Sequence, residues 1–488
     1  QVYVAANKAL KQFQEFITSK EGTSYSLYNT GITGTCVCAA FSFEMVRWLR
    51  KTRKDDIRFV SFEADDAQIQ SILSVVMLKV ESEILQDANA EWRGWLKRSL
   101  QKGEDTLDQL IAIFSASSIR PEVKDELWNA IGINVEIRFT DRCSLPAHLV
   151  KPYFHRSLIR KHGTPKQAAN AAPIAITIDD ADRIIDCCRM ILVRHLREID
   201  TTTFTSPELV SYYQLPRGYS IALMGMVPER RHPVDSYMGW LVFKNGLPVS
   251  YAAVWILFDS ARIGLNVFPG FRGGEAQYIF QQVLQLHSKV YGIKRYTVDP
   301  YQLGKENNDG IRSGSFWVYH NAGFRPILPL QHSLASEEAK KIRSIPGYRT
   351  PVSALKILAE SRLELFVQKT STGFDATDLS IAWIDILKTY YKGNRLLATN
   401  AGAKKLAAIL SIRNFQEATM KFVLENWALL LLSSKENKWQ NDKKFKAKLI
   451  KLFELKAYGS EEQFISSLQE LPALKKLLDE HLRTAIQS

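Results

Sequence analysis

The chain has 488 residues, of which 46% are apolar, so it is far too long for a single small core and is expected to form two or three domains. It contains no run of about 18 apolar residues, which argues against a membrane-spanning helix. Lys and Arg number 64 against 51 Asp and Glu, and the net charge of +13 favours anionic partners such as nucleic acid, a phosphate-rich cofactor, an acidic carrier protein or a membrane surface.

Residues 1–160 have a mainly helical pattern and are expected to form an N-terminal domain with a few short strands. In three segments, apolar residues recur at spacings of three and four, as on one face of a helix. Two shorter segments alternate apolar and polar residues, as half-buried strands do. The expected helices are 41–53, 66–85 and 106–115, and the expected strands are 57–62 and 133–140.

A linker is expected at 161–176, where the sequence KHGTPKQAANAAPIAI is rich in small residues, contains proline and has no period. A second domain is then expected at 175–330. It opens with a helix at 178–200, whose first aspartates can cap the helix and oppose its dipole, and a second short helix follows at 206–215.

An antiparallel meander of about four strands is expected next, over 219–268. Asn-Gly at 245–246 is a strong hairpin signal, and Asp-Ser at 259–260 marks a second turn. The stretch FPGFRGGEAQ at 268–277 follows the last strand. Its glycines let the backbone approach another group closely, and the helix that starts there offers unpaired N–H groups to an anion.

The order after the glycines is helix (275–292), strand (294–299), helix (308–323) and strand (324–327). Because two parallel strands need a crossover connection, the strand before the glycines and the strand at 294–299 are expected to lie side by side and parallel. The sheet is therefore mixed. In such sheets the ligand crevice lies outside the carboxyl ends of the strands, which is where Arg272 and its glycines fall.

Residues 331–488 return to helical spacing and are expected to form a C-terminal helical region. No period of 30 to 45 residues supports a repeat array. Lysines crowd the segment from Lys435 to Lys456, which predicts either a solvated helix face or an anion-binding patch. The expected helices are 336–345, 351–368, 402–412 and 417–433. The whole chain is thus expected to be α+β, with a central mixed-sheet domain between mainly helical regions.

The cysteines are odd in number and have no regular spacing, which fits neither a disulfide framework nor a zinc site. A reducing, cytoplasmic location and the absence of a metal are expected. No secretory signal pattern is found, and the sequence begins at Gln1 rather than at a methionine, so a preceding segment is compatible with it. The cysteines are Cys36, Cys38, Cys143, Cys187 and Cys188.

Two motifs resemble the GNAT superfamily of acyl-CoA-dependent N-acyltransferases. The sequence RGGEA at 272–276 looks like the pyrophosphate loop of that family, which usually reads Arg/Gln-x-x-Gly-x-Gly/Ala. The sequence YHNAGF at 319–324 looks like the tyrosine and the Gly-Phe pair that close the last core helix of the family. Together with the order of elements, the resemblance covers about residues 175–330.

The resemblance implies where a coenzyme A thioester would bind. In the family, the strand before the loop and the next parallel strand splay apart, pantetheine lies between them, and the pyrophosphate rests on N–H groups at the start of the helix. Asn308 stands one helical turn further from the tyrosine than the asparagine of the family does. The implied pantetheine contacts are the main chains of Asn266, Val267 and Phe268, and the implied pyrophosphate contacts are Arg272, Gly273, Gly274, Glu275 and Ala276.

The loop departs from the family pattern at two positions. Glu275 stands where a glycine is expected, and Gln277 stands where a glycine or alanine is expected. A carboxylate next to a pyrophosphate is unfavourable unless the side chain points away. The orientation of Glu275 is therefore decisive for this interpretation.

Aminolysis of a thioester needs a neutral amine and an acid that protonates the departing thiolate. Tyr319 matches the acid of the family, and a phenol can supply that proton at neutral pH. Glu229 and Asp299 are the candidates for the base, with Glu275 and His232 as further possibilities. Arginines that could bind an acidic substrate or the ribose phosphate are Arg230, Arg231, Arg312 and Arg325.

The expected function is transfer of an acyl group, with acetyl the expected one, from acyl-CoA to the amine of an unidentified acceptor. Two alternatives remain. A transferase of the same fold could use aminoacyl-tRNA, which the charge of +13 would help to bind. A scaffold could instead keep the fold without binding the cofactor, and Glu275 in the loop favours that interpretation.

Overall fold

The computed structural model of the chain describes residues 8, 9, 11–13, 15, 27–85, 91–140, 144–155, 157–159, 165, 166, 169–272, 274–368, 370, 373–433 and 437–486. The fold is mixed α/β, with a mixed sheet and helical flanks. The chain divides into two compact units. One comprises residues 1–144 and 186–198, and the other comprises residues 145–185 and 199–488.

The first unit contains an antiparallel three-stranded sheet in the order β1-β3-β2. The strands expected from alternation, β2 (Ile57–Phe62) and β3 (Ile133–Arg138), are confirmed, whereas β1 (Cys36–Ala40) was not expected. Phe43, Phe114 and Trp128 form an aromatic core with ring centroids 5.0 to 5.9 Å apart. The helices are α2 (Phe43–Thr52), α3 (Asp66–Val76), α4 (Lys79–Leu85), α5 (Trp92–Ser99), α6 (Thr106–Ala116) and α7 (Pro121–Ile131).

The second unit is built on a sheet of ten strands among the described residues, in the order β12-β13-β11-β9-β8-β7-β6-β5-β4, with β10 also paired to β8. All neighbours are antiparallel except β9 and β11, which are parallel as the sequence predicts. The strands are β4 (Ala172–Ile174), β5 (Val210–Gln214), β6 (Tyr219–Met224), β7 (Ser236–Lys244), β8 (Leu247–Leu257), β9 (Ser260–Ile263), β10 (Asn266–Val267), β11 (Arg295–Val298), β12 (Arg325–Pro326) and β13 (Leu363–Phe366).

Three segments differ from their predicted structure. The helix expected at 206–215 is a 3₁₀ turn (Pro207–Leu209) followed by β5, because pairing with β6 outweighs the local pattern. The linker expected at 161–176 contains β4, which pairs with β5. The helix expected at 351–368 stops at Leu358, and β13 follows it between β11 and β12, so the sheet continues beyond residue 330.

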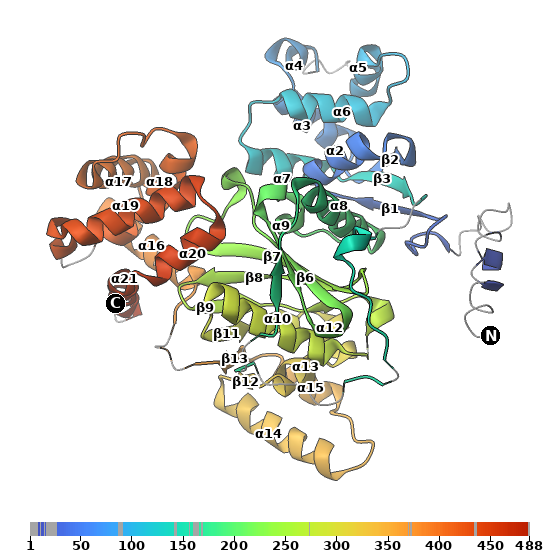
Figure 1. Cartoon of the computed structure of the whole chain (residues 1–488). Helices are drawn as coiled ribbons and strands as arrows, with labels where there is room; N and C mark the ends of the chain where they lie inside the picture. The colour runs from blue at the N-terminus through green and yellow to red at the C-terminus, as the bar shows by residue number, and fades with distance from the viewer. Residues whose placement is uncertain are drawn as a thin grey trace. The chain divides into compact units, whose positions relative to one another are not determined.

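Helices cover both faces of this sheet. α10 and α13 cover the face turned to the viewer in Figure 1, where Phe280 and Phe316 are buried against the sheet. On the other face, α9 packs its Thr201 against Gly239 of β7. The helices are α8 (Ile178–Arg194), α9 (Asp200–Thr203), α10 (Ala276–Tyr291), α11 (Pro300–Leu303), α12 (Asn308–Ser313), α13 (Ser315–Asn321), α14 (Pro329–Ser344) and α15 (Val352–Leu358).

The C-terminal helices form a second core around Trp427, which is fully buried. Leu257 and Phe258, at the turn after β8, belong to the same core, so these helices pack directly on one end of the sheet. The helices are α16 (Ala376–Tyr391), α17 (Arg395–Leu410), α18 (Ala418–Leu432), α19 (Lys443–Tyr458), α20 (Glu461–Gln469) and α21 (Pro472–Ile486).

Candidate functional site

The parallel strands β9 and β11 separate at their carboxyl ends. Their pairing ends at Arg262 and Thr297. Beyond β9 the chain continues to pair with β8 and not with β11. Ile263 pairs with Val254, and Asn266, three residues later, pairs with Tyr251, three residues earlier on the antiparallel β8, so the register is unbroken. The two parallel strands therefore diverge at the edge where ligands bind in open α/β sheets.

The loop after β10 leads directly into α10. Phe268 donates its N–H to Val249 O at 3.1 Å, and a 3₁₀ turn (Pro269–Phe271) follows. Gly274 is exposed, and α10 begins at Ala276. Among the described residues, no hydrogen-bond acceptor is found for the N–H groups of residues 274–278; Gly273, three and four residues before Ala276 and Gln277, lies outside them. The first turn of α10 thus offers a set of unpaired donors at the mouth of the diverging strands.

The side chain of Glu275 points away from these donors. Its carboxylate accepts hydrogen bonds from Tyr219 Oη at 2.6 Å and from the N–H of Ile159 at 3.0 Å. Arg217 Nη2 lies 3.4 Å away and Lys244 Nζ lies 3.8 Å away. Burial alone would raise the pKa of Glu275, but these hydrogen bonds and the nearby cations outweigh it and lower the pKa. The side chain of Glu275 therefore points away from the expected pyrophosphate position, as the resemblance to the GNAT loop requires.

The other residues expected at the loop have partners in the protein. Arg272 donates through Nε to Val267 O at 3.2 Å and through Nη2 to Asp309 at 3.1 Å, so it links β10 to α12. The main-chain oxygen of Asn266 accepts from Ser250 Oγ at 2.6 Å. Gly273 lies outside the described residues.

Tyr319 lies on α13 and is 1% exposed. Its ring packs edge-on against Phe280, with centroids 5.3 Å apart. Burial raises the pKa of its phenol, and a hydrogen bond from the backbone of Leu265 opposes that shift. Since Leu265 connects β9 to β10, the Tyr319 hydroxyl is placed at the point where the two parallel strands diverge.

Asp299 directly follows β11, the other diverging strand, and two arginines form ion pairs with its carboxylate. Arg262 Nη1 lies 3.2 Å from Oδ2, and Arg362 Nε lies 3.4 Å from Oδ1. A cavity of about 40 Å³ beside them is lined by Arg262, Arg362 and Ser260. This volume suits a few water molecules and is too small for an acceptor.

Asn308 is exposed at the start of α12. The neighbouring Asn307 caps that helix, since its Oδ1 accepts from the N–H of Gly310 at 3.2 Å. The structure thus gives the helix-starting role to Asn307 and leaves the side chain of Asn308 in solvent.

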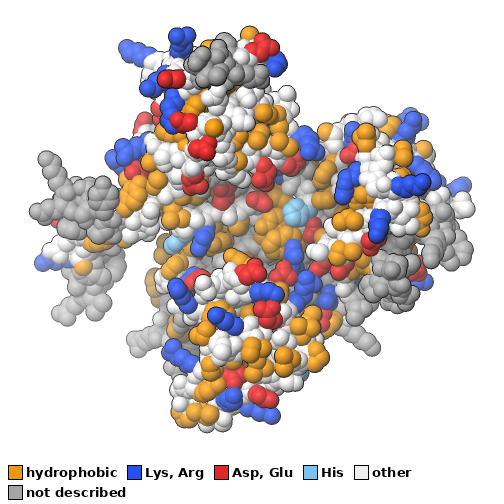
Figure 2. Space-filling view, turned by 180° about the vertical axis from the view of Figure 1, so that it is seen from behind, with side chains coloured by type: hydrophobic (Ala, Val, Ile, Leu, Met, Phe, Trp, Pro, Cys, Tyr) orange, Lys and Arg blue, Asp and Glu red, His pale blue; other side chains and the backbone are white. Residues whose placement is uncertain are grey.

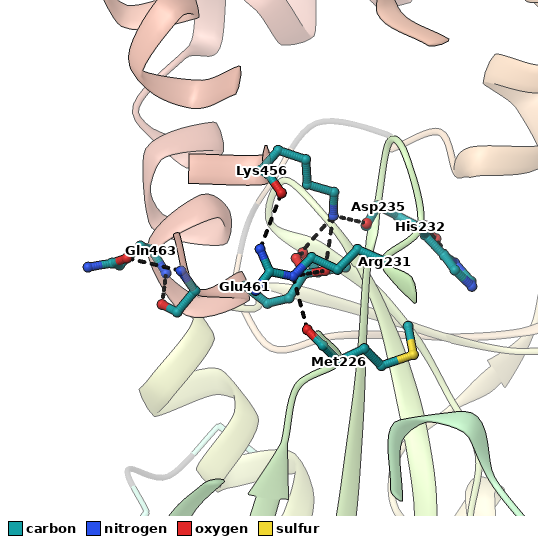
Figure 3. A network of polar contacts seen from close by, with 9 residues as sticks. Met226, Arg231, His232, Asp235, Lys456, Glu461 and Gln463 are labelled. Carbon is teal, nitrogen blue, oxygen red and sulfur yellow. Dashed lines mark hydrogen bonds and ion pairs between the residues drawn. The ribbon is translucent and has the colours of Figure 1, made fainter. Parts of the chain in front are cut away.

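Glu229 lies in a 3₁₀ turn (Pro228–Arg230) between β6 and β7 and is exposed. The next residue but one, Arg231, is buried: its Nε donates to Met226 O at 3.0 Å and its Nη1 donates to Lys456 O at 3.2 Å (Figure 3). Arg231 therefore has a structural role, which corrects its assignment as a substrate or phosphate ligand. The same turn leads to His232.

His232 and Asp235 form an oriented pair that motif analysis did not single out. His232 Nδ1 lies 3.0 Å from Asp235 Oδ1, and the side chains are 38% and 7% exposed, respectively. The imidazole stacks on Tyr237, which in turn stacks on Trp255, with centroids 5.1 and 4.5 Å apart. No sequence motif joins these residues, although the spacing of three between His232 and Asp235 is a weak signal.

The stack lies on the face of the sheet opposite to α10. Arg262 extends it, with its guanidinium 4.6 Å from the centre of the Trp255 ring, and Asp299 follows Arg262. Figure 2 shows the molecule from the side opposite to the view of Figure 1, with hydrophobic and charged side chains intermixed on its surface. The two faces of the sheet thus present different chemistry, with Tyr319 on one and an aromatic and charged strip on the other.

No family model, curated protein or solved structure matches the chain. Among the described residues, no group of three or more His, Cys, Asp or Glu side chains is arranged to hold a metal ion. In the same part of the chain, no helix is both long and apolar enough to cross a bilayer.

Two features mark the region where the parallel strands diverge: the start of α10 and the Tyr319 hydroxyl beside Leu265. Unpaired amides at a helix start attract negative charge. The phenol of Tyr319 is buried at the strand divergence, and burial raises its pKa.

Proposed function

We propose that the second unit transfers an acyl group, acetyl being the expected one, from acyl-CoA to an amine. The observation that carries this proposal is the divergence of the parallel strands β9 and β11 beside the unpaired amides of residues 274–278. The resemblance of RGGEA and YHNAGF to GNAT motifs supports the same conclusion. The position of β13 makes the sheet of this domain longer than residues 175–330.

In this proposal the pyrophosphate rests on the first turn of α10. Exposed Gly274 lets the diphosphate approach the backbone, because a side chain there would occupy that space. Pantetheine runs along β10 toward Leu265. Arg217 and Lys244 offset the charge of Glu275 near the phosphates, so that carboxylate does not repel them strongly.

The reaction joins the acceptor nitrogen to the thioester carbonyl carbon and breaks the carbon–sulfur bond. The amine loses one proton, and the departing thiolate gains one. Tyr319 is the proposed donor of the second proton: burial keeps its phenol protonated at neutral pH, and the hydrogen bond from the Leu265 backbone, which opposes the rise in its pKa, favours the phenolate that donation leaves behind. Leu265, whose backbone binds the phenol, holds it at the point where the thioester would lie.

The acceptor is proposed to approach from the opposite face, along the strip that ends at Asp299. The Asp299 carboxylate is the proposed acceptor of the proton that the amine loses, so that the neutral nitrogen is held facing the carbonyl carbon. Arg262 and Arg362 restrict how Asp299 can turn. Glu229 remains a candidate for proton transfer only if the acceptor brings its amine toward the 3₁₀ turn.

A titration of acetyl-CoA into the purified protein tests the proposal. The substitution Gly274→Asp adds a carboxylate beside the unpaired amides, and a Cβ there meets only Phe271 O at 3.4 Å, so the fold should be retained. We expect affinity for acetyl-CoA to fall at least tenfold. The control is Gly270→Asp, at a position where a Cβ meets nothing within 4 Å.

The wild-type protein should also gain about 2.7 kcal/mol of stability at 100 times its dissociation constant. Absence of saturable binding, or equal losses in the two aspartate variants, would contradict the proposal.

A non-catalytic domain of the same fold is the second candidate. It is favoured by Tyr319, whose 1% exposure requires the strands to open before a substrate can reach the phenol. The two candidates differ in one readout. A scaffold binds no acetyl-CoA and releases no thiol from it in the presence of amines, whereas the transferase does both.

A further inference from the structure

Helix α19 carries most of the charge excess of the C-terminal region. Residues 376–488 contain 18 Lys and Arg against 12 Asp and Glu, and α19 alone holds six of these basic residues and one of the acidic ones. Four of its lysines are exposed. They are Lys443, Lys444, Lys448 and Lys451, which we name the α19 lysine face.

Among the described residues, the α19 lysine face has no acidic partners. Within the described residues, no carboxylate lies within ion-pair distance of any of its four lysines, and Lys448 bonds only the backbone oxygen of Glu470, at 3.3 Å. Other lysines of the same region are paired. Lys475 lies 2.7 Å from Asp259, and Lys421 lies 3.7 Å from Glu425. The charges of these four lysines are therefore not compensated by ion pairs within the described part of the chain.

Helix stability does not explain this arrangement. Lys443 and Lys444 stand in the first turn, where the helix dipole disfavours cations. Lys444 and Lys448 form a like-charge pair at i and i+4, and Lys448 and Lys451 form another at i and i+3. Because each of these placements weakens the isolated helix, an external anion is the partner that would make them favourable.

The geometry fits a phosphodiester backbone. From Lys444 to Lys451 the helix rises by about 10 Å, which corresponds to about three successive phosphates of one nucleic acid strand. Most large apolar residues of α19 pack toward the core: Phe445, Leu449, Leu452 and Phe453 are buried, Ile450 and Leu455 are half-buried, and Tyr458 in the last turn is exposed. A membrane surface would need an apolar face for insertion, which these residues do not provide.

The helix is also fixed in place. Lys456, in its last turn, is fully buried and donates to Asp235 O at 2.8 Å and to the carboxylate of Glu461 at 3.0 and 3.1 Å (Figure 3). A surface held in this way offers its lysines in one arrangement, so little is lost in ordering them on binding.

From these observations we infer that the α19 lysine face binds the phosphate backbone of a nucleic acid. This inference is independent of acyl transfer. The binding is through phosphates, so RNA and DNA share the required chemistry, and sequence would have little effect on affinity.

The test measures fluorescence anisotropy of labelled 24-nucleotide probes with the full chain, at salt concentrations from 50 to 200 mM. The probes are single-stranded RNA, single-stranded DNA and an RNA duplex. The test variant carries Lys443→Ala, Lys444→Ala, Lys448→Ala and Lys451→Ala. The control variant removes four exposed helix lysines elsewhere, with Lys97→Ala, Lys340→Ala, Lys356→Ala and Lys388→Ala.

Four phosphate contacts correspond to a slope of about 3 in log affinity against log salt for a single strand, or about a 50-fold loss between 50 and 200 mM. We expect the test variant to lose that slope and at least tenfold in affinity at 100 mM salt, with the control within twofold of wild type. Equal losses in both variants would mean that net charge alone acts and would overturn the inference. So would an absence of binding at 50 mM salt, or binding only to polyglutamate or to vesicles containing phosphatidylserine. The RNA and DNA probes identify which nucleic acid is preferred.

Discussion

Removal of the Glu461 charge should destabilise the junction between the C-terminal helices and the sheet. Glu461 is 1% exposed in its side chain, and its carboxylate binds Lys456 Nζ at 3.0 Å and accepts from Ser236 Oγ at 2.5 Å. Arg231 Nε lies 3.9 Å from the same carboxylate, and its side chain is 2% exposed. One buried acid thus compensates two buried cations (Figure 3).

The substitution Glu461→Gln keeps the shape of the side chain and removes its charge. Lys456 and Arg231 then lose the buried carboxylate that they share, although the charges of Asp235 and Glu229 still act on them, and breaking a buried pair in this way costs about 3 to 5 kcal/mol. Burial already lowers the pKa of Lys456, although Glu461 opposes that shift. In the variant, Lys456 should therefore titrate lower still.

Urea unfolding followed by circular dichroism measures the effect, together with limited proteolysis of the C-terminal helices. The control is Glu462→Gln, at the exposed neighbouring residue, which should change stability by less than about 0.5 kcal/mol. The double variant Lys456→Met/Glu461→Gln should be less destabilised than Glu461→Gln alone, because it leaves one buried cation fewer. A loss below about 1 kcal/mol in Glu461→Gln, or one no larger than in Glu462→Gln, would refute the reasoning.

Three further predictions concern the sheet and the helices on it. Tyr319→Phe should lower the turnover of thiol release from acetyl-CoA with an amine panel by about 10- to 100-fold, with unchanged affinity for acetyl-CoA; unchanged turnover would remove Tyr319 as the acid. His287 is fully buried, and burial lowers its pKa from 6.5 to about 4. Between these two pH values the unfolded state binds a proton that the folded state does not. The free energy of unfolding is therefore unaffected by His287 above pH 6.5 and should fall by about 3 kcal/mol as the pH drops toward 4. His287→Phe should flatten that dependence in urea unfolding between pH 7 and 4.5, and an identical dependence in both proteins would contradict the assignment. Gly239→Ala should destabilise by about 1 to 3 kcal/mol, since its Cβ would lie 2.0 Å from Thr201 Oγ1 and 2.7 Å from Thr201 Cβ, and Thr201→Gly, which removes both atoms, should recover part of the loss in thermal unfolding.

The regular parts of the fold follow from local signals in the sequence. Asn245 and Gly246 have the positive φ values of 50° and 81° that the hairpin between β7 and β8 requires, and the Asn-Gly pair predicts that turn. Helix α10 ends where Gly292 adopts a left-handed conformation, as its glycine indicates. The parallel pairing of β9 and β11 also follows, because the crossover helix between them is visible in the periodicity.

The short strands depend on distant partners instead. β13 has only four residues within a stretch of helix-forming ones, and it is a strand because β11 and β12 pair with it on either side. β5 is set by its pairing with β4 and β6 in the same way. Local pattern cannot supply these contacts, which is why both segments were predicted as helices.

The candidate site likewise has some features that local sequence predicts and others that depend on distant residues. The loop, the helix start and Tyr319 are recognisable from residues close together in the sequence. The orientation of Glu275 is not, because its partners Tyr219 and Ile159 lie 56 and 116 residues away. The stacking of His232 on Tyr237 and of Tyr237 on Trp255 likewise needs the sheet to bring β7 and β8 together.

Hydrogen exchange with mass spectrometry, with and without saturating acetyl-CoA, tests the central claim most directly. The amides at 264–278 are the groups proposed to face pantetheine and the diphosphate, and those at 274–278 are unpaired in the structure. We predict slower exchange in peptides spanning 264–278 and in α13, with little change in α16–α21. Unchanged exchange across 264–278, or protection confined to another part of the chain, would contradict the claim that the diverging strands form the acyl-CoA site.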